Sequence, residues 1–88
     1  MERQVTICNK LGLHARAAAK LVSVANGFAA EVLVEKDGKR INGKSIMGVM
    51  MLAASQGTQV RLRVSGEDEQ AAMDALVELI EDRFGEGE

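Results

Sequence analysis

The spacing of the hydrophobic residues changes several times along this chain, and these changes limit the folds that it can adopt. In residues 58–65, Val60, Leu62 and Val64 alternate with polar residues. An alternation with a period of two is typical of a strand that buries one face and leaves the other in water. The same period over residues 4–7 predicts another strand near the N-terminus.

A β-hairpin is predicted in the middle of the chain. Residues 31–36 alternate between polar and apolar side chains, and residues 39–42 provide a short return strand. Asp37-Gly38 lies between them, and this dipeptide is preferred in a two-residue hairpin turn because both of its residues need a positive φ angle. We expect the return strand to lie at an edge of the sheet.

Helical spacing predicts a first helix over residues 15–26, where apolar residues recur three and four positions apart. Its buried stripe comprises Ala18, Leu21, Val22 and Ala25. The helix begins at His14 or beside it, and Gly27 is expected to end it in the left-handed conformation.

Two further helices are predicted in the second half of the chain. Ser45 precedes the apolar run 46–52 and is suited to cap a short helix there. The acidic residues 67–69 favour the first turn of a last helix, where the macrodipole attracts negative charge. The core-facing stripe of this last helix comprises Met73, Leu76, Val77, Ile80 and Phe84.

The predicted element order is therefore βαββαβα. Strands with one polar face suit a sheet that is covered on one side only, so we expect an α+β, open-faced sandwich with three helices on one face. The late strand can insert between the first two as a split βαβ unit. A chain of 88 residues buries a single core, so residues 1–88 form one domain. Residues 85–88 are predicted to be a frayed tail.

Composition argues against several classes of function. With eleven basic and thirteen acidic residues and only two aromatic side chains, no nucleic-acid surface is expected. One histidine and one cysteine without a local carboxylate cluster predict no metal site, and no cofactor is implied. The sequence has no long apolar run, so we expect neither a signal peptide nor membrane insertion. A lone cysteine fits a reducing compartment, and we expect a cytoplasmic protein.

The only histidine, His14, lies at the predicted start of the first helix, where several features favour an anion. A helix start exposes unpaired N–H groups, here those of the Ala15 and Ala17 region, at the positive end of the macrodipole. Gly12 lets the loop bend close to the site, and Arg16 adds a permanent positive charge. A neutral imidazole is nucleophilic near pH 7 and forms a labile N–P bond. From geometry alone, however, a histidine at a helix start is more often a simple cap.

The run Gly12-Leu13-His14-Ala15-Arg16 resembles the active-site signature of the HPr family, the histidine-containing phosphocarriers of the bacterial phosphoenolpyruvate-dependent phosphotransferase system (PTS). Residues 43–50 resemble the family's second signature, and residues 65–70 resemble its usual entry into the last helix. The resemblance implies a four-stranded antiparallel sheet with strand order 1-4-2-3.

The resemblance also implies roles for individual residues. Enzyme I would phosphorylate His14 on Nδ1, Arg16 would steady the phosphate, and enzyme II A-type domains would receive it. Such a protein is a monomeric carrier with a transient phosphohistidine rather than an independent turnover enzyme. Ser45 matches the serine that HPr kinase/phosphorylase modifies in part of the family. Ala17 stands where the family usually has Pro, and because alanine is a strong helix former, we expect phosphorylation to survive.

The apolar run 46–52 contains more hydrophobic residues than a two-turn helix on a sheet can bury. We expect Val49 and Leu52 to face inward. The residues expected to face outward beside the histidine, where the resemblance implies partner docking, are Ile46, Met47 and Met50. Flexible methionine side chains suit a surface that fits several partners in turn. The alternative is that these methionines are ordinary core residues.

Two rival functions stay open. A carrier of the nitrogen-related PTS shares the same chemistry but passes phosphate only to regulators. A non-catalytic interaction module would use His14 as a cap and the methionine surface to bind a regulator. Incubation with enzyme I and phosphoenolpyruvate separates the carrier from the module.

Overall fold

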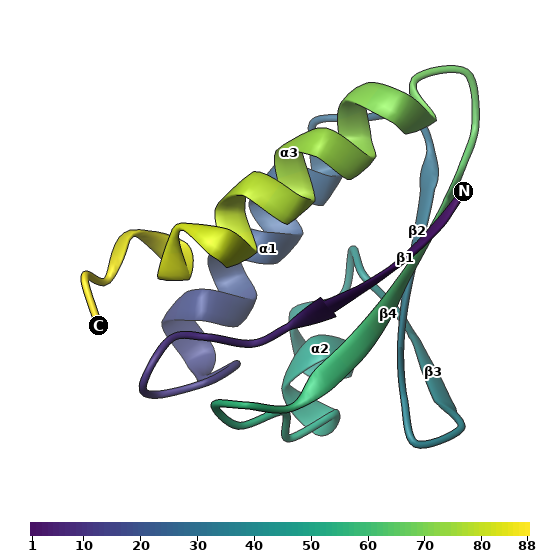
Figure 1. The fold of residues 1–88 in the computed structure, drawn as a ribbon. Helices are drawn as coiled ribbons and strands as arrows, with labels where there is room; N and C mark the ends of the chain where they lie inside the picture. Colours follow the sequence, from purple (N-terminus) through teal and green to yellow (C-terminus); the bar gives the residue numbers. More distant parts are fainter.

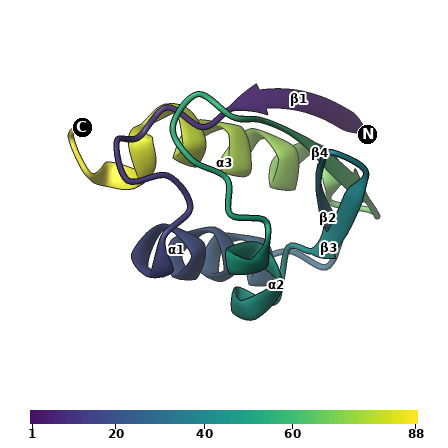
Figure 2. The same cartoon turned by 90° about the horizontal axis from the view of Figure 1, so that it is seen from below.

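The computed structural model describes residues 1–88 as a four-stranded sheet with helices packed on one of its faces (Figure 1, Figure 2). Neighbouring strands are antiparallel, in the order β1-β4-β2-β3. The elements follow the chain as β1 (Glu2–Thr6), α1 (Ala15–Asn26), β2 (Glu31–Lys36), β3 (Lys39–Asn42), α2 (Ile46–Met51), β4 (Gln59–Ser65) and α3 (Glu69–Glu81), with a 3₁₀ turn (Arg83–Gly85) after them. The predicted fold class and strand order are confirmed.

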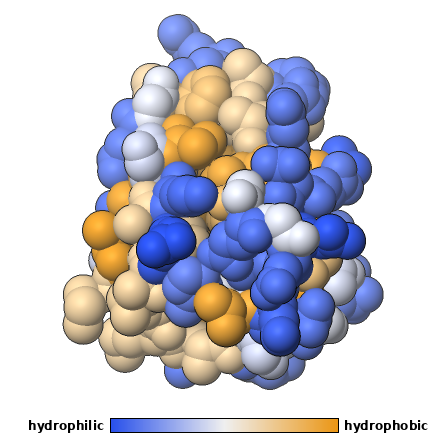
Figure 3. Space-filling view, turned by 90° about the vertical axis from the view of Figure 1, so that its left-hand side faces the viewer, coloured by the Kyte–Doolittle hydropathy of each residue, from blue (hydrophilic) through white to orange (hydrophobic).

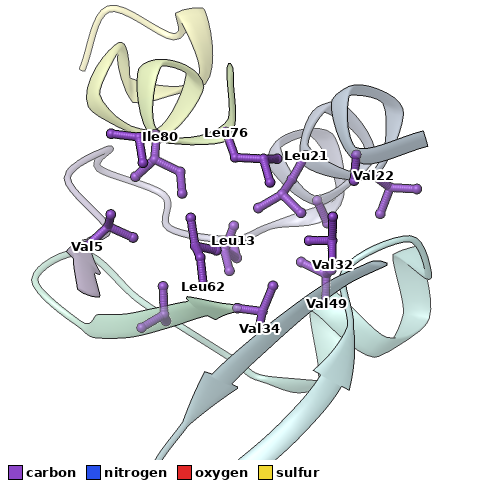
Figure 4. Close-up of a cluster of buried hydrophobic side chains, with 14 of the residues drawn as sticks. Val5, Leu13, Leu21, Val22, Val32, Val34, Val49, Leu62, Leu76 and Ile80 are labelled. Atoms are coloured by element: carbon purple, nitrogen blue, oxygen red, sulfur yellow. The ribbon is translucent and has the colours of Figure 1, made fainter. Parts of the chain in front are cut away.

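The late strand β4 lies between β1 and β2, as a split βαβ unit requires. Val60 of β4 pairs with Val5 of β1, and Leu62 pairs with Val34 of β2. These four side chains are buried, while Arg61 between them in β4 is exposed on the other face. Figure 4 shows aliphatic side chains of the sheet and of the helices facing one another across a continuous core.

The predicted helical stripes are buried. They comprise Ala18, Leu21, Val22 and Ala25 in α1 and Met73, Leu76, Val77 and Ile80 in α3. Ala17 is buried as well, so the first turn of α1 already packs against the core. The orientation of α2 is also confirmed, because Val49 and Leu52 are buried.

The central hairpin has the predicted geometry. Asp37 and Gly38 have φ angles of 50° and 79°, as a turn with two left-handed residues requires. The strand β3 pairs only with β2 and is therefore an edge of the sheet.

The end of α1 corrects the expectation for Gly27. Its φ angle is −75°, which is right-handed, so the prediction of a left-handed stop is wrong. The N–H of Gly27 donates to the carbonyl oxygen of Val24 at 3.0 Å, and the N–H of Phe28 donates to that of Ala25 at 3.2 Å. These bonds span three residues and tighten the last turn, so the helix ends without a left-handed residue.

The start of α3 also differs from the expectation, because Asp68 occupies the N-cap position and its carboxylate bonds to another segment. The carboxylate accepts the N–H groups of Ala29 and Ala30, both at 2.8 Å. The N–H of Ala29 is the main cause that holds the pKa of Asp68 below its ordinary value. Of the three acidic residues, only Glu69 lies in the first helical turn.

The helix α3 ends at Glu81, before the last residue of its predicted stripe. Phe84 is fully buried, but it lies in the 3₁₀ turn with a φ angle of +54°. The preceding residue, Arg83, has the same left-handed φ. These two residues turn the chain back toward the start of α1, where the C-terminus lies (Figure 1). None of the helices has the length and apolar character needed to cross a membrane.

Candidate functional site

The loop before α1 is anchored to the segment that follows α2. Leu13 is buried, and its N–H donates to the carbonyl oxygen of Ala54 at 2.8 Å. Gly12 has a φ angle of +66°, and a Cβ there would lie 2.5 Å from the same carbonyl oxygen. Only glycine allows this approach. The anchor fixes the place at which His14 leaves the loop.

His14 is the N-cap of α1, with φ −74° and ψ 179°. Its side chain is 28% exposed. Nδ1 accepts the N–H of Arg16 at 3.3 Å, and Nε2 lies 2.5 Å from Oε2 of Glu86. A carboxylate only accepts hydrogen bonds, so the ring proton belongs on Nε2. The contacts therefore favour the neutral tautomer whose lone pair lies on Nδ1.

Glu86 is held from the other side by Asn9, which is fully buried. The Nδ2 group of Asn9 donates to Oε1 of Glu86 at 3.0 Å and to the carbonyl oxygen of Gly12 at 2.8 Å. The bond from Asn9 and then the bond from His14 hold the pKa of Glu86 below its ordinary value. A carboxylate is thus fixed between the loop and the imidazole.

The C-terminal residues lie against the site. The ammonium group of Lys20 donates to the carbonyl oxygen of Phe84 at 2.6 Å, and the N–H of Lys10 donates to that of Glu88 at 2.9 Å. Residues 85–88 are the segment for which a frayed tail is predicted, and in the structure they make defined contacts with α1 and the preceding loop.

A hollow of roughly 620 Å³ opens beside the imidazole, and side chains of both charges line it. Lys10, Arg16 and Lys20 supply positive charge, and Glu86 and Glu88 supply negative charge. Arg16 is exposed and forms no ion pair within the chain. Of the residues predicted to hold an anion, Ala15 and Arg16 therefore lie beside His14 in this hollow.

The backbone of the first turn of α1 has unpaired donors next to His14. The N–H groups of Ala15 and Ala17 have no acceptor within the chain. Such unpaired donors at a helix start favour a bound anion. Ala15 lines the hollow, whereas Ala17 is fully buried and does not line it.

The predicted docking residues lie on α2, which packs against α1. Ser45 caps this helix, because its Oγ accepts the N–H of Gly48 at 3.1 Å. The exposed side chains of the helix, with exposed fractions of 39–69%, are Ile46, Met47, Met50 and Met51. Figure 3 shows apolar surface in the lower part of the molecular end that carries the C-terminus, beside strongly hydrophilic side chains. Apolar and hydrophilic surface therefore lie next to each other on this end of the molecule.

Several residues of this end of the molecule were not predicted from the sequence, among them Lys10 and Lys20, which line the hollow. Asn9 and Glu86 contact each other across 77 positions of the chain, and no local pattern links them. Met51 is 63% exposed and extends the methionine surface by one residue. Its place next to Met50 in the apolar run was the only available signal.

Comparison with known proteins assigns the chain to a family. Residues 1–82 match the family model described as "PTS HPr component phosphorylation site". The chain belongs to the HPr family. Over 88 residues it is 57% identical to the phosphocarrier protein HPr of Cupriavidus necator, covering 100% of this chain and 99% of that one. HPr proteins are phosphocarriers of the PTS, and the family assigns the chain to that class.

Solved structures agree with this membership. The crystal structure of HPr-C-His from Thermoanaerobacter tengcongensis has a TM-score of 0.95 at 52% identity and covers 98% of this chain and 97% of its own. A structure described as an HPr dimer from the same organism has a TM-score of 0.80 at 54% identity, and it covers 93% of this chain and 94% of its own. Both coverages show that the likeness extends over nearly the whole fold.

Proposed function

We propose that this chain carries a phosphoryl group on Nδ1 of His14, accepts it from enzyme I and passes it to A-type domains of enzyme II. The observation that carries the proposal is the pair of contacts on the imidazole, which favours a lone pair on Nδ1 next to the start of α1. A phosphocarrier leaves much of the positioning to its partners. It needs a nucleophile and a modest anion cradle, and the contacts of His14 together with the unpaired Arg16 support this role.

The transfer is a displacement at phosphorus. The lone pair of Nδ1 forms the N–P bond while the bond from phosphorus to the donor atom breaks, and the electron pair of that bond returns to the donor. The N–H of Arg16, which points at Nδ1 in the free protein, and the unpaired N–H of Ala17 then have an acceptor in the phosphate oxygens. The guanidinium of Arg16 adds positive charge at the same place.

Ala17 is compatible with this role. A proline there would remove an N–H, whereas Ala17 keeps one that has no acceptor within the chain. We propose that the alanine side chain serves packing, since it is fully buried in the first turn of α1. Phosphate uptake by the Ala17→Pro variant at a rate close to that of the parent chain would agree with a merely supporting role for this N–H.

Ser45 is proposed to regulate docking. Its hydroxyl caps α2, and a phosphate there would place a dianion next to the exposed apolar side chains of that helix. The Ser45→Asp variant should therefore accept phosphate from enzyme I more slowly than the parent chain. Equal transfer rates for the two proteins would contradict regulation by this route.

The exposed side chains of Ile46, Met47 and Met50 are proposed to dock both enzyme I and the acceptors. This surface must stay free for successive partners, so we propose that the carrier works as a monomer in the cytoplasm. A molar mass of one chain, measured by light scattering at working concentration, is the expected result. A stable dimer, which one Thermoanaerobacter tengcongensis structure describes for its own protein, would contradict it.

The experiment that tests the function uses purified enzyme I and phosphoenolpyruvate. The parent chain should gain one phosphate that is labile in acid and stable in alkali, and the His14→Ala variant should gain none. No uptake by the parent chain would favour a non-catalytic interaction module. Incubation of the phosphorylated chain with candidate acceptors then distinguishes sugar-transport A-type domains from regulators of the nitrogen-related branch.

A further inference from the structure

We propose that Glu86 is a positioning residue for His14: its carboxylate holds the imidazole in the Nε2–H tautomer and offsets the positive charge that the ring gains when Nδ1 bonds phosphorus. Asn9 holds this carboxylate in place. The inference rests on the proposed transfer through Nδ1 of His14. It concerns a residue outside the sequence motif, 72 positions away.

Three polar side chains form one continuous series of hydrogen bonds at the site. Nε2 of His14 meets Oε2 of Glu86 at 2.5 Å, and Oε1 of Glu86 meets Nδ2 of Asn9 at 3.0 Å. The second hydrogen of Nδ2 goes to the carbonyl oxygen of Gly12 at 2.8 Å. Asn9 is fully buried, and the side chain of Glu86 is only 12% exposed, so water competes little with these bonds.

This series of hydrogen bonds needs a carboxylate at residue 86, between its two donors. Both neighbours of Glu86 donate, and a carboxylate is the side chain that accepts at both of its oxygens. An amide of the same shape would present one donor, so it would lose either the bond to Asn9 or the bond to the Nε2–H group. The arrangement therefore selects one tautomer of His14 through the chemistry of residue 86 and not through its shape.

The backbone turn at Arg83 and Phe84 helps to hold Glu86 in place. Arg83 and Phe84 both adopt a left-handed backbone, which is unfavourable for residues with a side chain and persists only where other contacts offset it. Those contacts are the burial of the Phe84 ring and the bond from Lys20 to the Phe84 carbonyl oxygen. The turn that they stabilise directs the next residues toward the imidazole.

Glu86 lies on the side of the ring away from the reacting atom. When the Nδ1 lone pair forms the N–P bond, the proton stays on Nε2 and the ring becomes cationic. The carboxylate accepts from that N–H and stabilises the charge without occupying the place of the phosphate. When the phosphoryl group leaves, the electron pair of the N–P bond returns to Nδ1, and the contact with Glu86 is restored to its initial form.

The test compares two isosteric variants with the same loss of charge. Glu86→Gln leaves one acceptor oxygen for the two donors that now bond to the carboxylate, whereas Glu88→Gln removes a carboxylate that lines the same hollow and makes no hydrogen bond with His14. We measure the tautomer of His14 from the ¹⁵N chemical shifts of its ring, in unphosphorylated protein at a pH at which the ring is neutral. We also measure the rate of phosphate uptake from enzyme I and phosphoenolpyruvate.

We expect the Nε2–H tautomer to dominate in the parent chain and in Glu88→Gln, and the Nδ1–H tautomer to gain population in Glu86→Gln. Uptake by Glu86→Gln should fall roughly tenfold, which is a modest loss for a group that positions and stabilises charge. Identical ring shifts and rates for the two variants would overturn the inference. A purely structural role would lower the thermal stability of Glu86→Gln without changing the tautomer, and this too would overturn it.

Failure of the proposed function and failure of the proposed role of Glu86 give different results. If the parent chain takes up no phosphate, the proposed function fails, while the tautomer measurement still reports on Glu86 in the free protein. If the parent chain and both variants take up phosphate equally, the carrier function stands and only the role of Glu86 falls.

Discussion

Replacing Gly12 with alanine should lower the free energy of unfolding more than the same change at a glycine whose surroundings are open. Gly12 has φ +66°, and the added Cβ would lie 2.5 Å from the carbonyl oxygen of Ala54 and 2.8 Å from Cα of Ser55. Both are backbone atoms, so neither can move aside as a side-chain end could. The Ala54 oxygen also accepts the N–H of Leu13, and any displacement weakens that bond.

The magnitude follows from two contributions. A residue with a side chain in the left-handed region costs about 1–2 kcal/mol. Forcing a methyl group into packed atoms costs about 1–3 kcal/mol more. The Gly12→Ala variant should therefore lose roughly 2–5 kcal/mol of unfolding free energy, a large fraction of the stability of a small domain.

Gly38→Ala is the matched control. Gly38 has φ +79°, but no atom lies within 4 Å of the position its Cβ would take. This variant bears only the conformational cost of about 1–2 kcal/mol. Urea denaturation followed by circular dichroism measures both free energies. Equal losses in the two variants would refute the claim that close approach of the backbone, and not turn conformation alone, requires glycine at position 12.

Three further outcomes are expected. Ser45→Ala should lower the unfolding free energy by about 1 kcal/mol in urea denaturation, because the N–H of Gly48 loses its acceptor at the start of α2. An unchanged midpoint would contradict the capping role of Ser45. Phe84→Ala should lower the unfolding free energy by about 3–5 kcal/mol, which thermal unfolding measures. It should also weaken the contact between Glu86 and His14, which the ring shifts of His14 report. Because the folded-state pKa of Asp68 lies below its ordinary value of 3.8, its stabilisation is fully present above that value and is lost as the pH falls through the lower folded-state pKa. Asp68→Asn should therefore show a weaker dependence of stability on pH in acid, and an unchanged slope would count against the bonds to Ala29 and Ala30.

The elements of the fold could be predicted because their signals are local. Alternation placed β2 at residues 31–36, and the Asp37-Gly38 pair placed the hairpin turn, because side-chain direction and φ preference depend on near neighbours. The neighbourhood of His14 and Arg16 was predictable for the same reason, since both belong to one helix start.

The parts that sequence analysis missed depend on distant contacts. Gly27 has the freedom to adopt a left-handed φ, but the short bonds of the last turn of α1 decide its conformation. Asp68 is typical of a helix start, yet its carboxylate bonds to residues 38 and 39 positions earlier. The motif 85–88 is rich in Gly and Glu and has no apolar residue, so nothing in it predicts that Glu86 would meet a histidine near the other end of the chain.

The account depends most on where the phosphoryl group is attached. The ¹⁵N-labelled chain, incubated with enzyme I and phosphoenolpyruvate, can be studied by NMR for coupling between phosphorus and the ring nitrogens of His14. We predict coupling to Nδ1, with Nε2 still facing Glu86. Phosphorus bonded to Nε2, or to any residue other than His14, would contradict the account.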